Sequence, residues 1–424
     1  MPPVNNQLTP SAFLSRLRGL SRQRHYALAV SGGADSIALL GLAIGAAKLK
    51  GAPKFSVLTV DHGLRVAARA ETQMVAKWAR DHGLAAHVLR YRGEKPTSAV
   101  QNWARNMRYD LMSDFCEKHK ISTLVTAHHM GDQAETFLMR LARGSGLRGL
   151  SAMQLVSQRK NILILRPMLS QLPENLRDLC ASKKWHFIED PSNSDRAYER
   201  VRIRNLWPQL NEIGLTPEMI ARSAEKLSLV ASDMDAQLDE LIECHGMFNP
   251  LGFVEISRDI FEGLTETMQS GLLSRCLSHI SGVDYPPSVQ SLEHMRLQAL
   301  SGLVAAMTLK GVQMRSRKNH ILLGRETKKA ANMDDLACED AGDYVWDGRF
   351  AIHFNQGAKG RRIRALGSYG LGEMRDRMSQ REMPQKRDVP SGYLAALPAI
   401  YKGEKLVGCP SLIAIKGISV SIVN

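Results

Sequence analysis

The stretch that decides the fold reads YALAV-SGGADS and runs from Tyr26 to Ser36. Five residues of apolar character, the length of a short buried strand, lead directly into two glycines, and a helical pattern starts at Ser36. Adjacent glycines let the backbone turn tightly and bring its amides close to a ligand, while the start of a helix presents unpaired N–H groups and a partial positive charge. The order strand, glycine turn, helix therefore predicts a phosphate-binding loop.

The side chains of this loop, and the nucleotide-binding motifs that it does not match, indicate which ligand it binds. Asp35 can hold the Mg²⁺ that accompanies ATP, and two serines can add hydrogen bonds; the alternative is a plain strand-to-helix turn. There is no G-x-x-x-x-G-K-[ST] motif, and no G-x-G-x-x-G follows the strand. Without the lysine, the loop is suited to grip a pyrophosphate that leaves, so we expect adenylation chemistry. The expected ATP contacts are Ser31, Gly32, Gly33, Ala34, Asp35 and Ser36.

Short apolar runs alternate with amphipathic stretches from His25 to about Ile188, which is the pattern of a parallel α/β sheet. The expected strands are residues 26–30, 55–60, 86–89, 123–127 and 185–188. The expected helices are residues 36–48, 67–82, 98–118 and 132–143. With right-handed crossovers, these elements form a doubly wound parallel sheet.

The pattern changes after Pro208. Thr216 and Pro217 read as an N-cap and a first-turn proline, and apolar residues three and four apart from Ile220 to Leu241 predict a long amphipathic helix. Shorter helices are expected to about residue 300, followed by β-rich segments at 308–326 and 344–354 with a basic hairpin turn at 315–319. The stretch 357–387, rich in Gly, Arg and Met, predicts a mobile or RNA-facing loop, and residues 393–423 predict further short strands.

The length of 424 residues predicts two or three domains at about 150 residues each. We expect a catalytic domain at residues 1–210, a helical domain at 211–305 and a small, β-rich α+β domain at 306–424.

The composition narrows the partners and the compartment. Lys and Arg number 56 against 42 Asp and Glu, a surplus of 14, which favours a polyanionic partner. The six cysteines are far apart and form no Cys-x-x-Cys pair, so they predict reduced, inert thiols and no zinc site. The chain lacks both an apolar run of about 18 residues and the features of a secretory signal. We therefore expect a cytoplasmic protein that does not bind membranes.

Several motifs now carry a resemblance. The stretch from Ser31 to Ser36 resembles the PP-loop of ATP pyrophosphatases, which cleave ATP to AMP and pyrophosphate while activating a carbonyl oxygen. Over roughly residues 20–210, further motifs in the same order narrow the resemblance to the tRNA(Ile)-lysidine synthases. They are VDHGLR at 60–65, Ala104-Arg105 with Arg108-Tyr109, Ala127-His128-His129 through Asp132-Gln133 to Glu135-Thr136, RGSGLRGL at 143–150, and EDPSN at 189–193 leading to Arg200, Arg202 and Arg204.

The resemblance implies a reaction and its partners. Free L-lysine is attached to carbon 2 of the wobble cytidine of tRNA(Ile) with a CAU anticodon, through an adenylated cytidine, and codon reading changes from AUG to AUA. ATP and Mg²⁺ are the implied cofactors. The part beyond Pro208 is implied to recognise the tRNA, and a homodimer is left open.

The strand ends place further residues near the loop, because ligands bind beyond the carboxyl ends of strands in an open parallel sheet. Asp61 follows one strand and is expected near the adenosine, with a routine turn residue as the alternative. His128 and His129 follow another strand and point to opposite sides. We favour His128 as the group that assists the adenylate step by a hydrogen bond or proton transfer, and one of the two as structural.

The helix over 98–118 carries two arginines. With Ala104 and Met107 in its buried stripe, Arg108 should lie beside that stripe and Arg105 further toward solvent. We therefore expect Arg108 to be catalytic, and the resemblance implies that it steadies the phosphate or the activated carbonyl; a solvated salt bridge is the alternative.

Asp132 and Glu135 are three residues apart and share a helix face. The resemblance assigns them to the ammonium groups of lysine and Arg200 to its carboxylate, with helix capping and surface pairing as the alternative. Three glycines in 144–149 predict a flexible loop that contacts RNA or closes over the site. The expected RNA contacts are Arg143, Arg148, Arg202 and Arg204.

Three other functions share part of this pattern. A PP-loop tRNA sulfur transferase would generally need a reactive cysteine or a Cys-x-x-Cys iron–sulfur site, which the sequence lacks. An amidating synthetase that uses ammonia would not explain the basic surplus. A noncatalytic RNA-binding protein with a vestigial nucleotide site is the third alternative, against which Asp35, Arg108, Asp132 and Glu135 argue.

Overall fold

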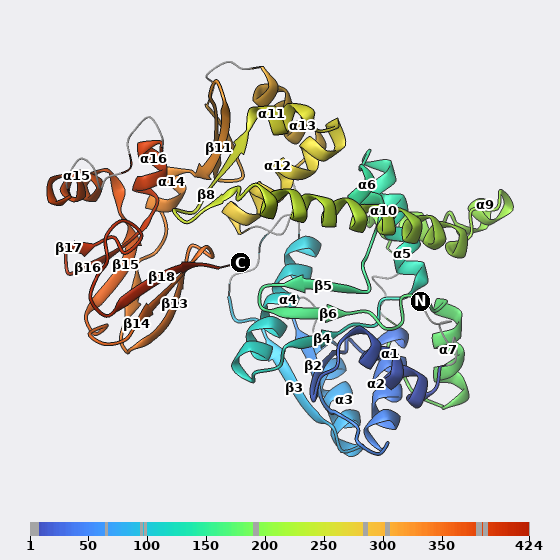
Figure 1. Cartoon of the computed structure of the whole chain (residues 1–424). Helices are drawn as coiled ribbons and strands as arrows, with labels where there is room; N and C mark the ends of the chain where they lie inside the picture. The colour runs from blue at the N-terminus through green and yellow to red at the C-terminus, as the bar shows by residue number, and fades with distance from the viewer. Residues whose placement is uncertain are drawn as a thin grey trace. The chain divides into compact units, whose positions relative to one another are not determined.

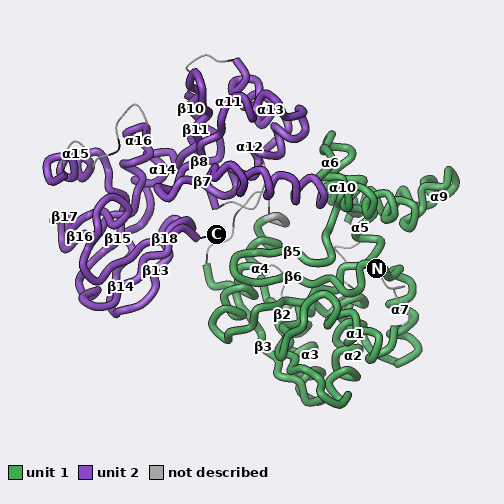
Figure 2. The backbone as a smooth tube through the Cα atoms, in the orientation of Figure 1, with its two compact units in different colours: residues 1–231 green, residues 232–424 purple. Residues whose placement is uncertain are grey.

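The computed structural model describes residues 8–63, 67–93, 96, 100–189, 195–282, 287–301, 306–378, 384 and 389–423, without the side chains of 67 and 100–102. The chain divides into two compact units, Met1–Ala231 and Ser232–Asn424 (Figure 2). The expected division at residues 210 and 305 stays a prediction.

Unit 1 is built on a six-stranded sheet in the order β3-β2-β1-β4-β6-β5 (Figure 1). The first five strands in this order are parallel to their neighbours, and β5 pairs antiparallel with β6. This confirms the doubly wound parallel sheet. The strands are β1 (His25–Ala29), β2 (Lys54–Asp61), β3 (Ala85–Arg90), β4 (Thr123–Val125), β5 (Val156–Arg159) and β6 (Ile162–Leu165).

Helices cover both faces of this sheet, because alternate residues of a strand point to opposite faces. Tyr26 and Leu28 of β1 pack into one core, which also contains residues of α1, α2, α3 and α7, and Ala27 packs into the other, which contains residues of α4. The helices are α1 (Pro10–Leu20), α2 (Ala34–Ala47), α3 (Ala67–Asp81), α4 (Val100–Lys118), α5 (Met130–Ala142), α6 (Leu147–Leu150), α7 (Pro173–Ser182), α8 (Glu199–Arg204) and α9 (Trp207–Glu212).

One predicted strand, at residues 185–188, was wrong. The structure has no strand there, and the hairpin of β5 and β6 supplies the missing strands of the sheet. Trp185 instead packs on α2, where a Cβ on Gly41 would lie 2.2 Å from its ring, and the Ile188 N–H donates to the Gly32 carbonyl at 2.9 Å. The apolar character of this segment thus serves contact with α2 and the glycine loop.

The long amphipathic helix is confirmed as α10 (Pro217–Cys244), which crosses the boundary between the units. Among the described residues, no helix combines the length and the apolar character needed to cross a membrane.

Unit 2 has three antiparallel sheets and two adjoining cores. The first sheet contains β7 (Phe248–Asn249), β8 (Phe253–Ser257), β9 (Ala306–Leu309), β10 (Val312–Ser316) and β11 (His320–Arg325). The second contains β12 (Leu336–Cys338), β15 (Arg361–Ala365), β16 (Pro398–Lys402) and β17 (Lys405–Gly408), and the third contains β13 (Gly342–Trp346), β14 (Phe350–Phe354) and β18 (Ile418–Ile422). The helices are α11 (Arg258–Gly263), α12 (Glu266–Ser281), α13 (Val289–Leu300), α14 (Thr327–Ala331), α15 (Gly367–Arg377) and α16 (Ser391–Ala395).

The β-rich prediction is confirmed here, and the hairpin between β10 and β11 turns inside the predicted basic segment. The predicted loop at 357–387 was wrong for its described part, since it contains β15 and α15. Ile363 of β15 and Leu371 and Met374 of α15 are buried, so both elements pack on the core. Residues 379–383 and 385–387 of that stretch lie outside the described residues.

Candidate active site

The glycine loop between β1 and α2 is held by one hydroxyl. Ser36 Oγ accepts the N–H of Ser31 at 3.2 Å and that of Gly32 at 3.0 Å, and donates to the Gly33 carbonyl at 2.9 Å. Gly33 is the N-cap of α2, so the amides of the first helical turn, including that of Asp35, face the loop without an intrahelical partner. A preorganised turn with outward amides suits an anionic ligand.

Gly32 is required by both conformation and space. Its φ is +102°, a region that favours glycine, and a Cβ there would lie 2.7 Å from Ile188 Cδ1. The segment after α7, which carries Ile188, therefore packs against the glycine loop.

The second part of the site is the start of α5, which follows β4, the neighbour of β1 in the sheet. His129 caps this helix: its Nδ1 accepts the Asp132 N–H at 3.2 Å, and its own N–H donates to Asp132 Oδ2 at 3.2 Å. Since Nδ1 accepts, the ring proton of a neutral His129 is on Nε2. His129 therefore has a capping role in which Asp132 takes part, and the assignment of one of the two histidines as structural stays a prediction.

His129 also joins the loop to α5. Its Nε2 lies 3.5 Å from Asp35 Oδ2 and 3.5 Å from Asp132 Oδ2, with its side chain 7% exposed. Burial lowers the pKa of His129, but the hydrogen bond to Asp35 and the charges of Asp132, Asp35 and Glu135 outweigh it and raise that pKa overall. The structure therefore brings Asp35 and Asp132, which are far apart in sequence, around one imidazole.

Glu135 lies one turn further along α5 and is paired with two arginines of α8. Its Oε1 accepts from Arg204 Nε at 2.8 Å and its Oε2 lies 3.3 Å from Arg200 Nε, while Arg200 Nη1 is 3.8 Å from Asp132 Oδ1. Burial raises the pKa of Glu135, and Arg204 opposes that rise. The structure thus brings together the three residues predicted for lysine. The guanidinium of Arg204, predicted to face RNA, is bound to Glu135.

His128 has a different environment from its neighbour. Its Nδ1 is 2.8 Å from Thr126 Oγ1, and burial, together with Arg166, Arg105 and Arg200, lowers its pKa to about 3, against the opposing charge of Asp132. A neutral imidazole can exchange hydrogen bonds at pH 7 but does not carry a proton to donate as an acid. Its catalytic role stays a prediction.

Arg166, which directly follows β6 and is buried, is not among the predicted site residues. Its Nη1 donates to the Gln154 carbonyl at 2.7 Å and to Ser157 Oγ at 3.0 Å. Its position at a strand end, after the apolar run at 162–165, is the signal that could have found it.

Arg105 is half-buried and Arg108 has more exposed surface, the reverse of the predicted order, although burial of the Arg108 guanidinium still lowers its pKa. Arg105 shares the inward face of α4 with Tyr109 and Met112, and its guanidinium lies 5.5 Å from the Tyr109 ring centre. The catalytic role of Arg108 stays a prediction, and of these two arginines it is Arg105 whose charge lowers the pKa of His128.

Asp61 adopts the turn geometry that was its alternative. Its Oδ1 accepts the Gly63 N–H at 3.0 Å, and its Oδ2 lies 3.8 Å from Arg90 Nε. It ends β2 beside β1, so the predicted contact with adenosine stays open to test.

The loop at 144–149 is more ordered than predicted, because it contains α6. Arg140 donates to the carbonyls of Gly149 and Ala152, both at 2.8 Å. Of the predicted RNA contacts, Arg143 is exposed and pairs with Glu199, Arg148 is half-buried, and Arg202 is exposed and donates to the Ala197 carbonyl at 2.9 Å. Residues 190–194, which include most of the EDPSN motif, lie outside the described residues.

Comparisons with known proteins place this geometry in a family. A model described as a PP-loop domain matches residues 6–210. The tRNA(Ile)-lysidine synthase of Anaplasma marginale (strain St. Maries) is 33% identical over 349 residues, which are 81% of this chain and 74% of that protein. The chain belongs to the tRNA(Ile)-lysidine synthase family. The synthase of Ruegeria pomeroyi is 30% identical over 400 residues, 91% of this chain and 88% of that protein, and that of Rhodopseudomonas palustris is 38% identical over 286 residues, 66% and 80%.

The two cysteines of unit 1, Cys116 and Cys180, fit a lysidine synthase better than a sulfur transferase. Cys180 is buried and donates to the Ala34 carbonyl at 3.5 Å, and burial, with the charge of Asp35, raises its pKa to about 11. Burial likewise raises the pKa of Cys116 to about 12. Thiols held protonated in this way are poor nucleophiles.

Proposed function

We propose that this lysidine synthase family member joins the ε-amine of free lysine to carbon 2 of the wobble cytidine of tRNA(Ile) with a CAU anticodon, at the expense of ATP. The observation that carries the proposal is the contact of Asp35 and Asp132 with one imidazole, His129, at 3.5 Å each. This contact places the glycine loop, which would bind the ATP that activates the cytosine, next to α5, which would bind the amine of lysine.

ATP fits the loop through the first-turn amides of α2, and Mg²⁺ fits Asp35. The Asp35 side chain is 37% exposed beside the loop. Mg²⁺ prefers one or two carboxylates together with substrate phosphates over an all-protein cage. Bound there, the ion would neutralise charge on the departing pyrophosphate.

Lysine fits the surface where α5 meets α8. The Asp132 side chain is 15% exposed, and burial is outweighed by His129, His128 and Arg200, which lower its pKa and keep it an anion. Arg200 is 34% exposed and can turn its free N–H groups to the lysine carboxylate. An ammonium group that reached Glu135 would replace an arginine partner, so Asp132 is the more accessible of the two proposed ligands.

The chemistry then follows in two displacements. The carbonyl oxygen of the cytosine attacks the α-phosphorus and pyrophosphate leaves, which makes that oxygen a good leaving group. The deprotonated ε-amine attacks carbon 2, and AMP departs with the oxygen. Asp132 holds and orients the amine, Arg105 and Arg108 supply positive charge beside the phosphate, and no step requires a cysteine.

Recognition of the tRNA beyond the cytidine is assigned to unit 2 and to the exposed arginines of unit 1, with affinity that falls as salt rises. A homodimer and a cytoplasmic location are part of the same proposal.

The test is incubation of the full chain with ATP, Mg²⁺, lysine and tRNA(Ile) with a CAU anticodon, followed by mass spectrometry of the digested nucleosides. We expect lysidine in place of cytidine, dependent on both ATP and lysine. AMP without lysidine would retain the PP-loop chemistry and reject lysine as the nucleophile. If tRNA is bound but no ATP is cleaved, the noncatalytic RNA-binding alternative is correct.

A further inference from the structure

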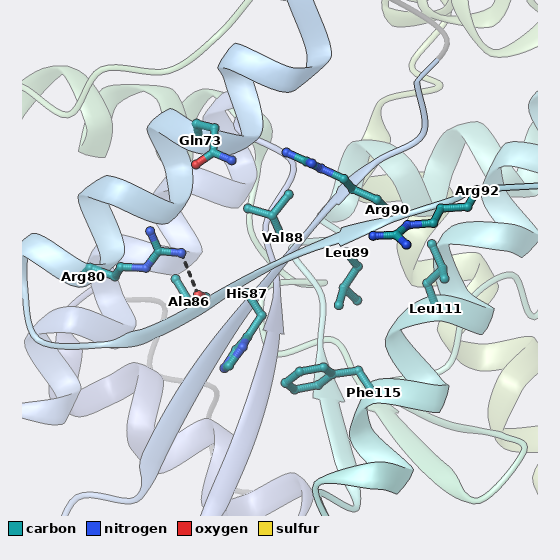
Figure 3. A pocket seen from close by; sticks show the side chains of 10 residues that line it. All are labelled: Gln73, Arg80, Ala86, His87, Val88, Leu89, Arg90, Arg92, Leu111 and Phe115. Carbon is teal, nitrogen blue, oxygen red and sulfur yellow. Dashed lines mark hydrogen bonds between the residues drawn. The ribbon is translucent and has the colours of Figure 1, made fainter.

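A groove of about 650 Å³ follows β3 along the outer edge of the unit 1 sheet (Figure 3). β3 is the end strand of the order β3-β2-β1-β4-β6-β5, so in the described part of unit 1 one edge of its backbone pairs with no other strand. Side chains of α3 and α4 form the two walls, and the floor from Ala86 to Arg90 is about 13 Å long. The groove is therefore an elongated channel along the strand.

The charge of this channel has one sign. Arg80, Arg90 and Arg92 line it, and no Asp or Glu among the described residues does. Arg80 is exposed and donates to the Ala86 carbonyl at 3.0 Å, and Arg92 is exposed and forms no ion pair within the described residues. Arg90 has only a loose contact with Asp61, at 3.8 Å. Guanidinium groups without a close carboxylate partner are suited to a ligand that carries several anionic groups in a row.

One wall of the channel carries flat rings. His87 lies 4.6 Å from Phe115 between ring centres, and Phe115 is stacked on His119 at 4.1 Å with 26° between the planes. Burial, with the charges of His119 and Arg80, lowers the pKa of His87. Aromatic rings beside arginines are the usual platform for unstacked bases of single-stranded or loop RNA.

We propose that this channel binds the sugar–phosphate backbone of a loop segment of the substrate RNA, with Arg80, Arg90 and Arg92 on the phosphates and Phe115 against a base. The identity of the RNA rests on the proposed function. β3 lies two strands from β1, roughly 10 Å away, and Arg90 reaches toward Asp61, which ends β2. RNA in the channel would thus continue toward the carboxyl edge where the cytidine has to react.

The decisive variant is Arg80→Gln with Arg92→Gln, which spares Arg90 because of its contact with Asp61. The matched control is Arg22→Gln with Arg24→Gln, two exposed arginines just before β1 that do not line the channel. Binding of the full chain to tRNA(Ile) with a CAU anticodon is measured without ATP or lysine, from about 50 to 200 mM salt. Thermal melting of each variant verifies that it is folded.

We expect the channel variant to bind the tRNA about tenfold or more weakly, and its slope of log affinity against log salt to be smaller by about two than that of the parent. Phe115→Leu should weaken binding without changing the slope, because no charge is lost. The control should keep the parental slope. Equal affinities and slopes for the channel variant and the control would overturn the proposal.

The same samples separate this proposal from the proposed function. If the parent forms no lysidine but its tRNA affinity responds to the channel variant as expected, the function fails and the channel stands. If lysidine forms and the response is absent, only the channel fails. A change of oligomeric state in gel filtration without a change in tRNA affinity would assign the open edge of β3 to a protein strand and overturn the RNA proposal.

Discussion

Glu135 in unit 1 and Asp347 in unit 2 are both buried carboxylates between two arginines, with side chains 2% and 1% exposed. The arginines of Asp347 are themselves 7% and 3% exposed, whereas those of Glu135 are 34% and 41% exposed. An ion pair closed on every side can serve only the fold. One whose cations reach the surface can exchange a partner with a ligand, which is what a site for a charged substrate requires.

The closed cluster ties together several parts of unit 2. Asp347 accepts from Arg325 at 2.5 Å and from Arg349 at 2.6 and 2.9 Å, at the turn between β13 and β14. Arg349 also donates to the carbonyl of Gly252 at 2.8 Å, and burial lowers its pKa. Each of these groups depends on the others because water cannot replace a lost partner.

The largest effect is expected from Asp347→Asn. Asparagine tolerates the backbone φ of +54°, but it leaves two buried guanidinium groups without a countercharge. We expect unfolding of unit 2 to become easier by about 3–5 kcal/mol, measured by urea denaturation. The control is Asp343→Asn in the same hairpin, whose side chain is 78% exposed. A loss below about 1 kcal/mol would mean that the cluster is not closed.

Asp35→Ala should change activity strongly and stability little, the opposite of Asp347→Asn. The side chain is 37% exposed and its contact with His129 is loose at 3.5 Å, so stability should change by less than about 1 kcal/mol. Loss of the proposed Mg²⁺ ligand should lower tRNA-dependent AMP formation about a hundredfold or more, while most tRNA affinity is kept. Unchanged AMP formation would remove Asp35 from the Mg²⁺ site.

Glu135→Gln tests whether the ion pairs of Glu135 with Arg200 and Arg204 contribute both to stability and to lysine binding. The amide keeps the shape but not the charge, and both arginines can turn to water. We expect a stability loss of only about 1–2 kcal/mol, together with a rise of about tenfold in KM for lysine. A loss as large as that of Asp347→Asn with no change in KM would make Glu135 a structural residue.

The sequence predicted those features of the two units that depend on residues close together in the chain. The loop, the parallel strands and the first turn of α5 follow from short spacings along the chain. The pairing of Arg204 with Glu135 did not, because it depends on how α8 packs on α5. Arg105 was misplaced because the inward face of α4 runs through Tyr109 and Met112, a rotation that only contact with the sheet fixes.

The β5–β6 hairpin was missed for a related reason. Its inner strand is the four-residue apolar run of Ile162–Leu165, which is too short to stand out, whereas the residues at 185–188 look like a strand and instead support Gly32. Closing the Asp347 cluster likewise requires contacts between segments nearly a hundred residues apart, as in the bond from Arg349 to Gly252.

His129→Asn separates the two contacts of the imidazole within the open site. Asparagine is a good N-cap, so α5 should keep its start, but its shorter side chain cannot reach Asp35. We expect a rate loss of about fivefold and a higher Mg²⁺ requirement, with stability close to that of the parent. His129→Ala should add a stability loss of about 1 kcal/mol. If both variants lost only stability, the contact with Asp35 would have no role in the reaction.

The effect that is smallest near neutral pH is a pH dependence of stability, caused by His128. The pKa of His128 falls from 6.5 to about 3 on folding, chiefly through burial. The unfolded chain therefore takes up a proton below pH 6.5 that the folded chain refuses until about pH 3, so the contribution of His128 to stability is complete above that window and is lost as the pH falls through it. His128→Asn removes the titrating group and keeps a polar atom near Thr126. Unfolding free energies measured between these limits should fall less steeply for this variant, by up to about 1.4 kcal/mol per pH unit. Parallel curves for the variant and the parent would show that the His128 ring is hydrated enough to keep its ordinary pKa.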